Sequence, residues 1–208
     1  MIFNCLLTGI GGQGTVTAAR LIGTAATARD FDVKGANTIG VSRRGGSVVS
    51  HIRIGENISS PLIPRGEADL IIAFEPAEAV RVHSFLSPTG RVLVLDRGIM
   101  PLAVRLGEEH YAAKDMLGYL KTWLYHPSEQ RLAQKDGGEW LIVIDTEKLI
   151  KKCGGSRLLN TALLGAAIRK KLLPLTEDDL KKAMRELLPP EYIEVNIRSF
   201  DAGGDLAG

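Results

Sequence analysis

Gly9, Gly11 and Gly14 have the G-x-G-x-x-G spacing of a turn that brings the backbone close to a phosphate-bearing ligand. An apolar run at 2–9 precedes them and an alanine-rich segment at 13–29 follows, so the pattern predicts a strand, a tight turn and a helix. The glycines would permit the turn, the approach of the ligand, and close packing of helix on strand. The unpaired N–H groups and the dipole at the helix start would attract an anion. The binding residues predicted in this turn are Gly9, Gly11, Gly12, Gln13 and Gly14.

The second half of a dinucleotide fingerprint is missing. An Asp or Glu that binds the ribose is expected about 20 residues further on. That region reads VKGANT, with Lys34, Ala36 and Asn37. An NAD site is therefore disfavoured, whereas Arg43 and Arg44 would suit the 2′-phosphate of NADP. Three interpretations of the turn stay open: a phosphate or carboxylate ligand, the loop of a partner protein, and glycines required only for packing.

A second motif, GVSRRGGSVVSHIRIG, places two arginines and two glycines directly before an expected strand. Loops that follow the strands of a parallel sheet form its ligand crevice, so Arg43 and Arg44 are expected near the glycine turn. Two guanidinium groups beside a helix N-terminus would attract an anion strongly. The alternative is a solvated basic loop. The contact residues predicted in this loop are Ser42, Arg43, Arg44, Gly45 and Gly46.

The composition is that of a globular protein and argues against several functions. The 208 residues are 45% hydrophobic and carry a net charge of +2, without an aromatic-rich basic stripe, so nucleic-acid binding is not expected. No apolar run reaches the roughly 18 residues of a membrane span. The N-terminal MIFNCLLTG has no basic leader, which predicts a cytoplasmic location. Cys5 and Cys153 are too few thiols for an iron–sulfur cluster, and the histidines lack metal-ligand spacing, so no metal site is expected.

Buried strands alternate with amphipathic or small-residue helices along the chain, and this alternation predicts the fold class. We expect a Rossmann-like, doubly wound α/β fold, with a mostly parallel sheet and helices on both faces. An antiparallel hairpin of 47–55 with 58–64 is expected beside it, and a helix over 114–126. The segment 128–138 is predicted to be a polar surface excursion. We predict a single domain at 1–200 and a disordered tail at 201–208.

Two amide side chains have open roles. Gln13 stands in the first turn of the expected helix, where its amide would meet a ligand or a partner, or would cap the helix. Asn160 stands in an otherwise apolar helix. Its amide either forms a hydrogen bond across a subunit interface or is satisfied by hydrogen bonds within the core.

Several motifs together resemble one protein family. GIGGQG, SRRGGSVVSHIRIG and SPLIPRGEADLIIAFEPAEA are similar to the gamma subunit, or gamma domain, of the 2-oxoacid:ferredoxin oxidoreductases. Within that family the motifs resemble most the small beta subunit of the indolepyruvate type. The resemblance continues through LSPTGRVLVLD, NTALLGAAI and PLTEDDLKKAMRELLPP.

The resemblance implies a subunit of an enzyme, with no catalytic residue of its own. Such enzymes oxidatively decarboxylate a 2-oxoacid with coenzyme A (CoA) and yield an acyl-CoA, CO2 and reduced ferredoxin. The resemblance implies that thiamine diphosphate, magnesium and [4Fe–4S] clusters are bound by a large alpha subunit and that this chain binds no cofactor firmly. It also implies that ferredoxin is a partner of the assembled complex rather than of this chain alone. The residues of the two motifs would then contact a CoA phosphate or an acidic loop of the large subunit. A stand-alone nucleotide- or CoA-binding module and an NADP-dependent reductase are the alternatives.

Overall fold

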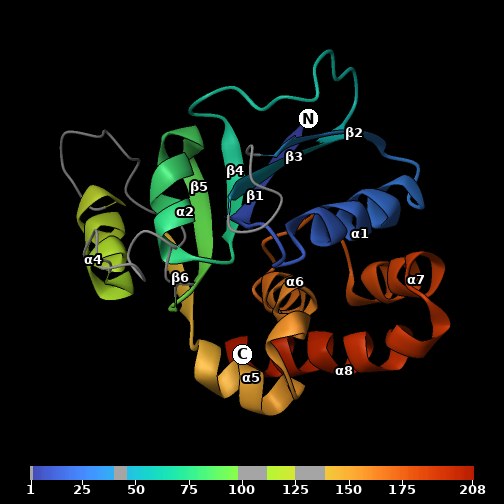
Figure 1. The fold of residues 1–208 in the computed structure, drawn as a ribbon. Coiled ribbons are helices and arrows are strands. Elements are labelled where there is room, and N and C mark those ends of the chain that lie inside the picture. The colour runs from blue at the N-terminus through green and yellow to red at the C-terminus, as the bar shows by residue number, and fades with distance from the viewer. Residues whose placement is uncertain (1, 40–45, 98–111, 125–138) are drawn as a thin grey trace.

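The computed structural model describes residues 2–39, 46–97, 112–124 and 139–208, in which six strands form one sheet with helices on both faces (Figure 1). The α/β class expected from the sequence is confirmed. The predicted contact residues Ser42, Arg43, Arg44 and Gly45 lie outside the described residues, as does the predicted excursion at 128–138. The strands are β1 (Phe3–Ile10), β2 (Asp32–Ile39), β3 (Ser47–Gly55), β4 (Ala68–Ala73), β5 (Leu86–Leu95) and β6 (Leu141–Ile144).

The strand order across the sheet is β2-β3-β1-β4-β5-β6. β1, β4, β5 and β6 run parallel to one another, and β3 is antiparallel to both β1 and β2. Parallel strands end at the same edge of a sheet, where ligands of α/β proteins bind. The glycine turn at the end of β1 therefore shares that edge with the ends of β4, β5 and β6.

The hairpin expected from 47–55 and 58–64 is wrong. β3 pairs instead with β2, from Asp32 opposite Gly55 to Ile39 opposite Val48, and residues 58–64 form no strand. Side chains of β3 hold the 58–64 segment. Arg53 donates to the carbonyls of Ser60 and Leu62 at 3.1 and 3.3 Å, and the Ile63 N–H donates to Nδ1 of His51 at 3.2 Å. Pro61 and Pro64 within this segment have no N–H group to donate to a neighbouring strand.

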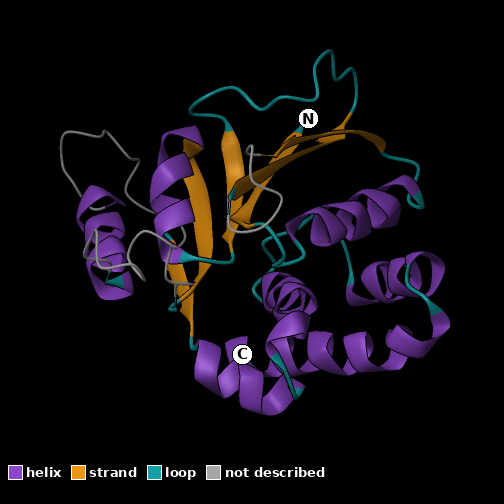
Figure 2. Cartoon of the chain, in the orientation of Figure 1, coloured by secondary structure: helices purple, strands orange, loops and turns teal. Residues whose placement is uncertain are grey.

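Helices lie on both faces of the sheet (Figure 2). α2 (Pro76–Val82) and α4 (Ala113–Leu124) lie on one face, and α1 (Thr15–Thr27) and α6 (Leu159–Arg169) on the other. α4 confirms the helix expected over 114–126. The other helices of the described residues, α5 (Thr146–Cys153), α7 (Glu177–Leu187) and α8 (Pro190–Ala207), pack outside α1 and α6. The 3-10 turns η1 (His83–Phe85) and η3 (Ser156–Leu158) join neighbouring elements. Among the described residues, no helix combines the length and apolar character needed to cross a bilayer.

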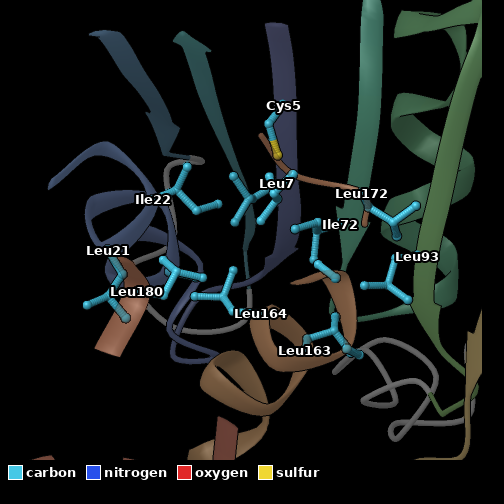
Figure 3. Packing of buried hydrophobic residues seen from close by; sticks show 14 of the residues in the cluster. Cys5, Leu7, Leu21, Ile22, Ile72, Leu93, Leu163, Leu164, Leu172 and Leu180 are labelled. Atoms are coloured by element: carbon cyan, nitrogen blue, oxygen red, sulfur yellow. The ribbon is translucent and has the colours of Figure 1, made fainter. Parts of the chain in front are cut away.

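The sheet separates two apolar clusters. Cys5 and Leu7 of β1 belong to the larger cluster, which α1 and α6 complete with residues such as Ile22 and Leu164 (Figure 3). Leu6 points to the opposite face and joins the smaller cluster under α2 and α4. Because alternate residues of β1 are buried on opposite faces, its sequence is largely apolar rather than alternating, with Asn4 and Thr8 as its polar residues.

The predicted disordered tail at 201–208 is also wrong. Residues 201–207 continue α8, which begins at Pro190 and packs against α6. Gly203 lies directly against the backbone of Ala162, and Ala207 is 6% exposed. The glycines and charges of DAGGDLAG suggested disorder, but Gly203 allows two helix backbones to approach closely, and this packing orders the segment.

Candidate functional site

The glycine turn has a backbone conformation that requires glycine at two positions. Gly12 and Gly14 have φ of +104° and +79°, in the region that side chains disfavour. Gly14 precedes the first residue of α1 and caps it without a side-chain hydrogen bond. The strand, turn and helix predicted around the glycines are therefore present, and the positive φ of Gly12 and Gly14 explains why glycine stands at these two positions.

Hydrogen bonds within the protein occupy much of this turn. The Gly11 N–H donates to the carbonyl of Gly46 at 2.8 Å, and the Gln13 N–H donates to Ile10 at 3.1 Å. The Gln13 side chain accepts from the Ile10 N–H at 2.7 Å and donates to the carbonyl of Phe74 at 3.4 Å. Gln13 thus joins the ends of β1 and β4. Two N–H groups of the predicted anion cradle, and the Gln13 amide, are already engaged.

Gly46 and Ser47 tie the start of β3 to this corner of the molecule. The Gly46 carbonyl accepts from Gly11, and the Ser47 hydroxyl donates to Oε2 of Glu78, which is 4% exposed on α2. Glu78 also pairs with Arg81, with 3.2 Å between Nε and Oε1. Gly46 of the second motif thus contacts the glycine turn, whereas Arg43 and Arg44, which the sequence predicts beside that turn, lie outside the described residues.

Asn160 packs against Gly14. A Cβ atom at Gly14 would lie 2.5 Å from Nδ2 of Asn160, so this contact also requires glycine. Asn160 is 7% exposed, and its Oδ1 has no hydrogen-bond partner among the described residues. The side chain is therefore buried in this chain, as the core alternative expected, but it is not fully satisfied there.

A crevice of about 350 Å³ lies beside the turn, at the edge where the parallel strands end. Its lining combines backbone of the turn, apolar side chains, and polar side chains that follow β5 or belong to α5 and η3. The lining residues are Gly11, Gly12, Gln13, Phe74, Leu95, Arg97, Thr146, Ile150, Ser156, Arg157 and Leu159.

The polar part of the crevice carries positive charge. Arg97 and Arg157 are the charged residues of its lining. Arg97 pairs with Glu147, and both side chains are more than half exposed, at 60% and 56%. Such exposed pairs contribute about 1 kcal/mol or less, so the guanidinium group is readily available to another anion.

Two carboxylates, those of Asp96 and Asp145, accept hydrogen bonds from N–H groups at the N-terminus of α5. The Thr146 N–H donates to Oδ1 of Asp96 at 2.9 Å, and the Lys148 N–H donates to Oδ1 of Asp145 at 2.9 Å. This donation lowers the pKa of Asp145 below its ordinary value. Thr146 is 4% exposed, and in the described part of the chain its Oγ1 has no partner. The positive end of the helix is thus already neutralised, and the guanidinium groups of Arg97 and Arg157 remain as the positively charged groups of the crevice.

Sequence reasoning missed the polar half of this crevice, formed by Arg97, Thr146, Ser156 and Arg157. A signal was present in part. Arg97 stands two residues after the apolar strand residues 92–95, and the ligand crevice of an α/β sheet is built at such strand ends. Arg157 follows two glycines at the other end of α5, and only the tertiary packing brings it near the turn.

A larger groove of about 560 Å³ lies elsewhere, between α1, the edge strand β2 and the end of α7. Arg20 and Glu186 are its charged residues, and it lies away from the edge where the parallel strands end. We therefore treat the smaller crevice as the candidate site. The described residues contain no cluster of three or more His, Cys, Asp or Glu that could hold a metal ion.

The amino-acid sequence places the chain in one family. Residues 4–206 match the family described as pyruvate ferredoxin/flavodoxin oxidoreductase. The chain belongs to that family, and the resemblance drawn from its motifs is confirmed.

Curated relatives and solved structures agree with this assignment. The chain is 34% identical to an indolepyruvate oxidoreductase subunit IorB of Thermococcus kodakarensis, over 97% of this chain and 94% of the relative. It is 34% identical to the IorB subunit of Methanothermobacter thermautotrophicus, over 98% and 96%. The fold resembles that of a keto/oxoacid ferredoxin oxidoreductase gamma subunit from Geobacter sulfurreducens, with a TM-score of 0.65, 18% identity, and coverage of 99% and 98%.

A further solved structure is 2-oxoglutarate:ferredoxin oxidoreductase from Magnetococcus marinus with 2-oxoglutarate, coenzyme A and succinyl-CoA bound. Its TM-score is 0.66 at 17% identity. The match covers 99% of this chain but 31% of that one. At this identity the likeness concerns the fold.

Proposed function

We propose that this chain is the small subunit of a 2-oxoacid ferredoxin oxidoreductase that acts on aryl 2-oxoacids such as indolepyruvate. The complex would oxidatively decarboxylate its substrate with CoA, to an acyl-CoA, CO2 and reduced ferredoxin. The observation that carries this proposal is the match over nearly the whole chain to IorB subunits, at 30–34% identity. The fold shared with a keto/oxoacid ferredoxin oxidoreductase gamma subunit supports it.

The redox cofactors are assigned to a large partner subunit. Thiamine diphosphate with magnesium and [4Fe–4S] clusters would supply the decarboxylation and electron-transfer chemistry there, and ferredoxin would meet the complex rather than this chain. The two cysteines support this division of labour, because a cluster requires about four thiolates. Cys5 is fully buried, and burial raises the pKa of its thiol far above the usual range, which disfavours the thiolate that binds metals.

The glycine turn and the arginine loop are proposed as the contact of this chain with a CoA phosphate or with an acidic loop of the large subunit. The hydrogen bonds of Gly11 and Gln13 support a positioning role for the turn itself. The arginines of the loop would then provide the charge. We also propose that the complex works in the cytoplasm, where the free thiols of Cys5 and Cys153 stay reduced.

The decisive experiment is anaerobic affinity purification of this chain from its native cells, with mass spectrometry, visible absorbance and assay of the eluate. We expect a brown complex with a large thiamine- and cluster-containing subunit that reduces ferredoxin with indolepyruvate and CoA. A colourless chain without a partner would contradict the proposal. In the same assay, Arg43→Ala combined with Arg44→Ala should weaken assembly or raise the KM for CoA, and an unchanged complex with unchanged CoA dependence would contradict the proposed loop contact.

A further inference from the structure

We propose that the outer edge of β2 is an interaction surface for an extended segment of the large subunit, which pairs with β2 as an additional strand of the sheet. The inference rests on the proposed function for the identity of the partner. β2 is the last strand on the side of α1 (Figure 1), and within the described sheet it pairs only with β3. Its other edge therefore presents backbone N–H and C=O groups that no strand of this sheet engages.

The edge of β2 lacks features that usually prevent a further strand from pairing. The register with β3 is continuous over eight residues, from Asp32 to Ile39, so no bulge twists the edge away. β2 contains no proline, and its charged residues, Asp32 and Lys34, both lie in its first half. The second half, from Gly35 to Ile39, is uncharged. Such an edge favours the addition of an extended segment by backbone hydrogen bonds.

The groove of about 560 Å³ along β2 provides room for the side chains of the added strand. Val33 and Gly35 face α1, because their register partners Ile54 and Ile52 belong to the apolar cluster that α1 completes. The opposite wall of the groove consists mainly of small residues of α1 and its C-terminal end: Ala19, Gly23, Thr24, Thr27 and Ala28. Because alternate side chains of a strand point to the same face, every second side chain of the added strand would enter this groove.

The charges of the groove suit a peptide segment that carries both signs. Arg20 on α1 and Glu186 on α7 are the charged residues of the lining, and both are exposed. Neither takes part in an ion pair among the described residues. One acidic and one basic side chain of the added strand would complement them. A small-molecule ligand is disfavoured, because no buried side-chain atom that lacks a hydrogen bond in the described part of the chain belongs to this lining.

The area of the edge favours a large partner over a second copy of this chain. The eight residues of β2 extend over roughly 26 Å, and with a sheet thickness of about 10 Å the edge offers on the order of 260 Å². Stable protein–protein interfaces bury about 800 Å² on each partner. Two copies joined through β2 alone would fall well short of this area, whereas a large subunit can cover the edge together with the surface around it.

The first test is hydrogen exchange, followed by mass spectrometry at single-residue resolution, on the free chain and on the complex purified from native cells. In an antiparallel edge strand, only every second N–H group bonds to the neighbouring strand. We therefore expect fast and slow amides to alternate along β2 in the free chain. The fast amides should exchange roughly 10-fold or more slowly in the complex, because the added strand bonds them. Unchanged exchange of β2 in the complex would overturn the inference.

A matched pair of variants at Gly23 tests the groove. A Cβ atom at Gly23 would meet, among the described residues, only Cγ1 of Val33, at an ordinary contact distance of 3.8 Å. Gly23→Ala should therefore leave assembly with the large subunit unchanged. Gly23→Leu fills the groove and should weaken assembly roughly 10-fold or more, measured by titration of the purified large subunit.

A second variant tests the edge without filling the groove. Asn37→Lys places a charge at an exposed position of β2, a device by which proteins block strand addition, and should weaken assembly as much as Gly23→Leu. Thermal unfolding of each free variant verifies that it is folded. Wild-type assembly of a folded Asn37→Lys chain would overturn the inference.

The inference and the proposed function fail separately. A complex that oxidises indolepyruvate with CoA, but in which the exchange of β2 is the same as in the free chain, would overturn the inference and leave the proposed function intact. A large subunit that pairs with β2 but has no oxidoreductase activity would support the surface and contradict the proposed function. Sedimentation of the free chain should show a monomer, and a dimer that Asn37→Lys dissociates would overturn the choice of partner.

Discussion

At the scale of single residues, the conformation of the backbone decides which glycines tolerate substitution. The desolvation of buried groups decides which side chains resist becoming charged. Gly14 and Gly12 both have positive φ, but only Gly14 has a neighbour, Asn160, in the space of a Cβ atom. His51 and Cys5 are buried titratable groups whose neutral forms are favoured. These differences lead to two predictions.

Gly14→Ala should destabilise the chain more than Gly12→Ala. Both variants force alanine into a left-handed conformation, at a cost of about 1 kcal/mol. At Gly14 the new Cβ atom also meets Nδ2 of Asn160 at 2.5 Å, whereas at Gly12 nothing among the described residues lies within 4 Å. We expect a total loss of about 2–4 kcal/mol for Gly14→Ala in the free energy of unfolding, measured by urea denaturation. Equal losses in the two variants would show that Asn160 moves aside freely.

The stability should depend on pH through His51. Burial lowers the pKa of His51 in the folded state, so the unfolded chain takes up the proton more readily. The free energy of unfolding should therefore fall as the pH decreases below 6.5, the ordinary pKa, by at most about 1.4 kcal/mol per pH unit. The control is His51→Asn, whose side-chain oxygen can accept from the Ile63 N–H without titrating in this range. Wild type and variant with the same slope between pH 7.5 and 5.5, in urea titrations, would contradict the prediction.

At the scale of elements, close contact between helix backbones orders the C-terminal part of the chain. Gly165 of α6 faces Phe200, and Gly203 of α8 faces Ala162, so the two helices approach each other at glycine on both sides. Buried polar groups join the same helices, because Thr161 donates to Oδ1 of Asn196 at 3.0 Å. α8 is therefore part of the folded core rather than an appendage.

Gly165→Ala should be strongly destabilising. Its Cβ atom would lie 2.7 Å from the carbonyl carbon of Phe200, and backbone atoms cannot rotate away. We expect a loss of about 3 kcal/mol in the free energy of unfolding. The matched control is Gly118→Ala in α4, where no atom among the described residues lies within 4 Å and the helical preference of alanine should add about 0.5–1 kcal/mol. Calorimetric midpoints that fall equally in both variants would contradict the close-packing argument.

A chain that ends at residue 200 should be less stable than the full chain. The deletion removes Gly203 and Ala207 from the α6 contact, and it removes Asp201, whose carboxylate lies 2.6 Å from Nζ of Lys181. We expect a loss of about 2 kcal/mol or more, mainly from lost apolar burial. Deletion of the exposed Gly208 alone is the control. If the longer deletion left the temperature of thermal unfolding unchanged, residues 201–208 would be a dispensable tail, contrary to this prediction.

At the scale of the whole molecule, stability should decrease from the centre of the sheet to its edges. β1 and β4 are central and have neighbours on both sides, whereas β2 pairs only with β3 within the described sheet. In hydrogen exchange followed by mass spectrometry, amides of β1 and β4 should exchange only on global unfolding, and those of β2 by local opening. Assembly should slow the exchange of surfaces that the partner covers. Equal protection of β1 and β2 in the free chain would contradict this gradient.

The pattern of residue types was sufficient for the α/β class, the strand–turn–helix at Gly9 to Gly14, and the family. These features are local: a strand buried on both faces is largely apolar, and a left-handed turn requires glycine. The partners of β3 are not local. Segments 47–55 and 58–64 are close in sequence, and both have residue types that are common in strands. The hydrogen bonds of Arg53 and His51 with the backbone of 58–64, however, form only in the folded chain.

The sequence by itself determined that a glycine turn follows β1, because conformational preference belongs to individual residues. Only the tertiary structure decided which groups are free to bind there. In the folded chain, Gly11 and Gln13 form hydrogen bonds with other residues of the protein. The fold also brings Arg97 and Arg157, which are 60 residues apart in the sequence, to one crevice. The physical reason is that a binding site depends on what remains unpaired after the chain has folded, and that balance includes contacts between residues far apart in the sequence.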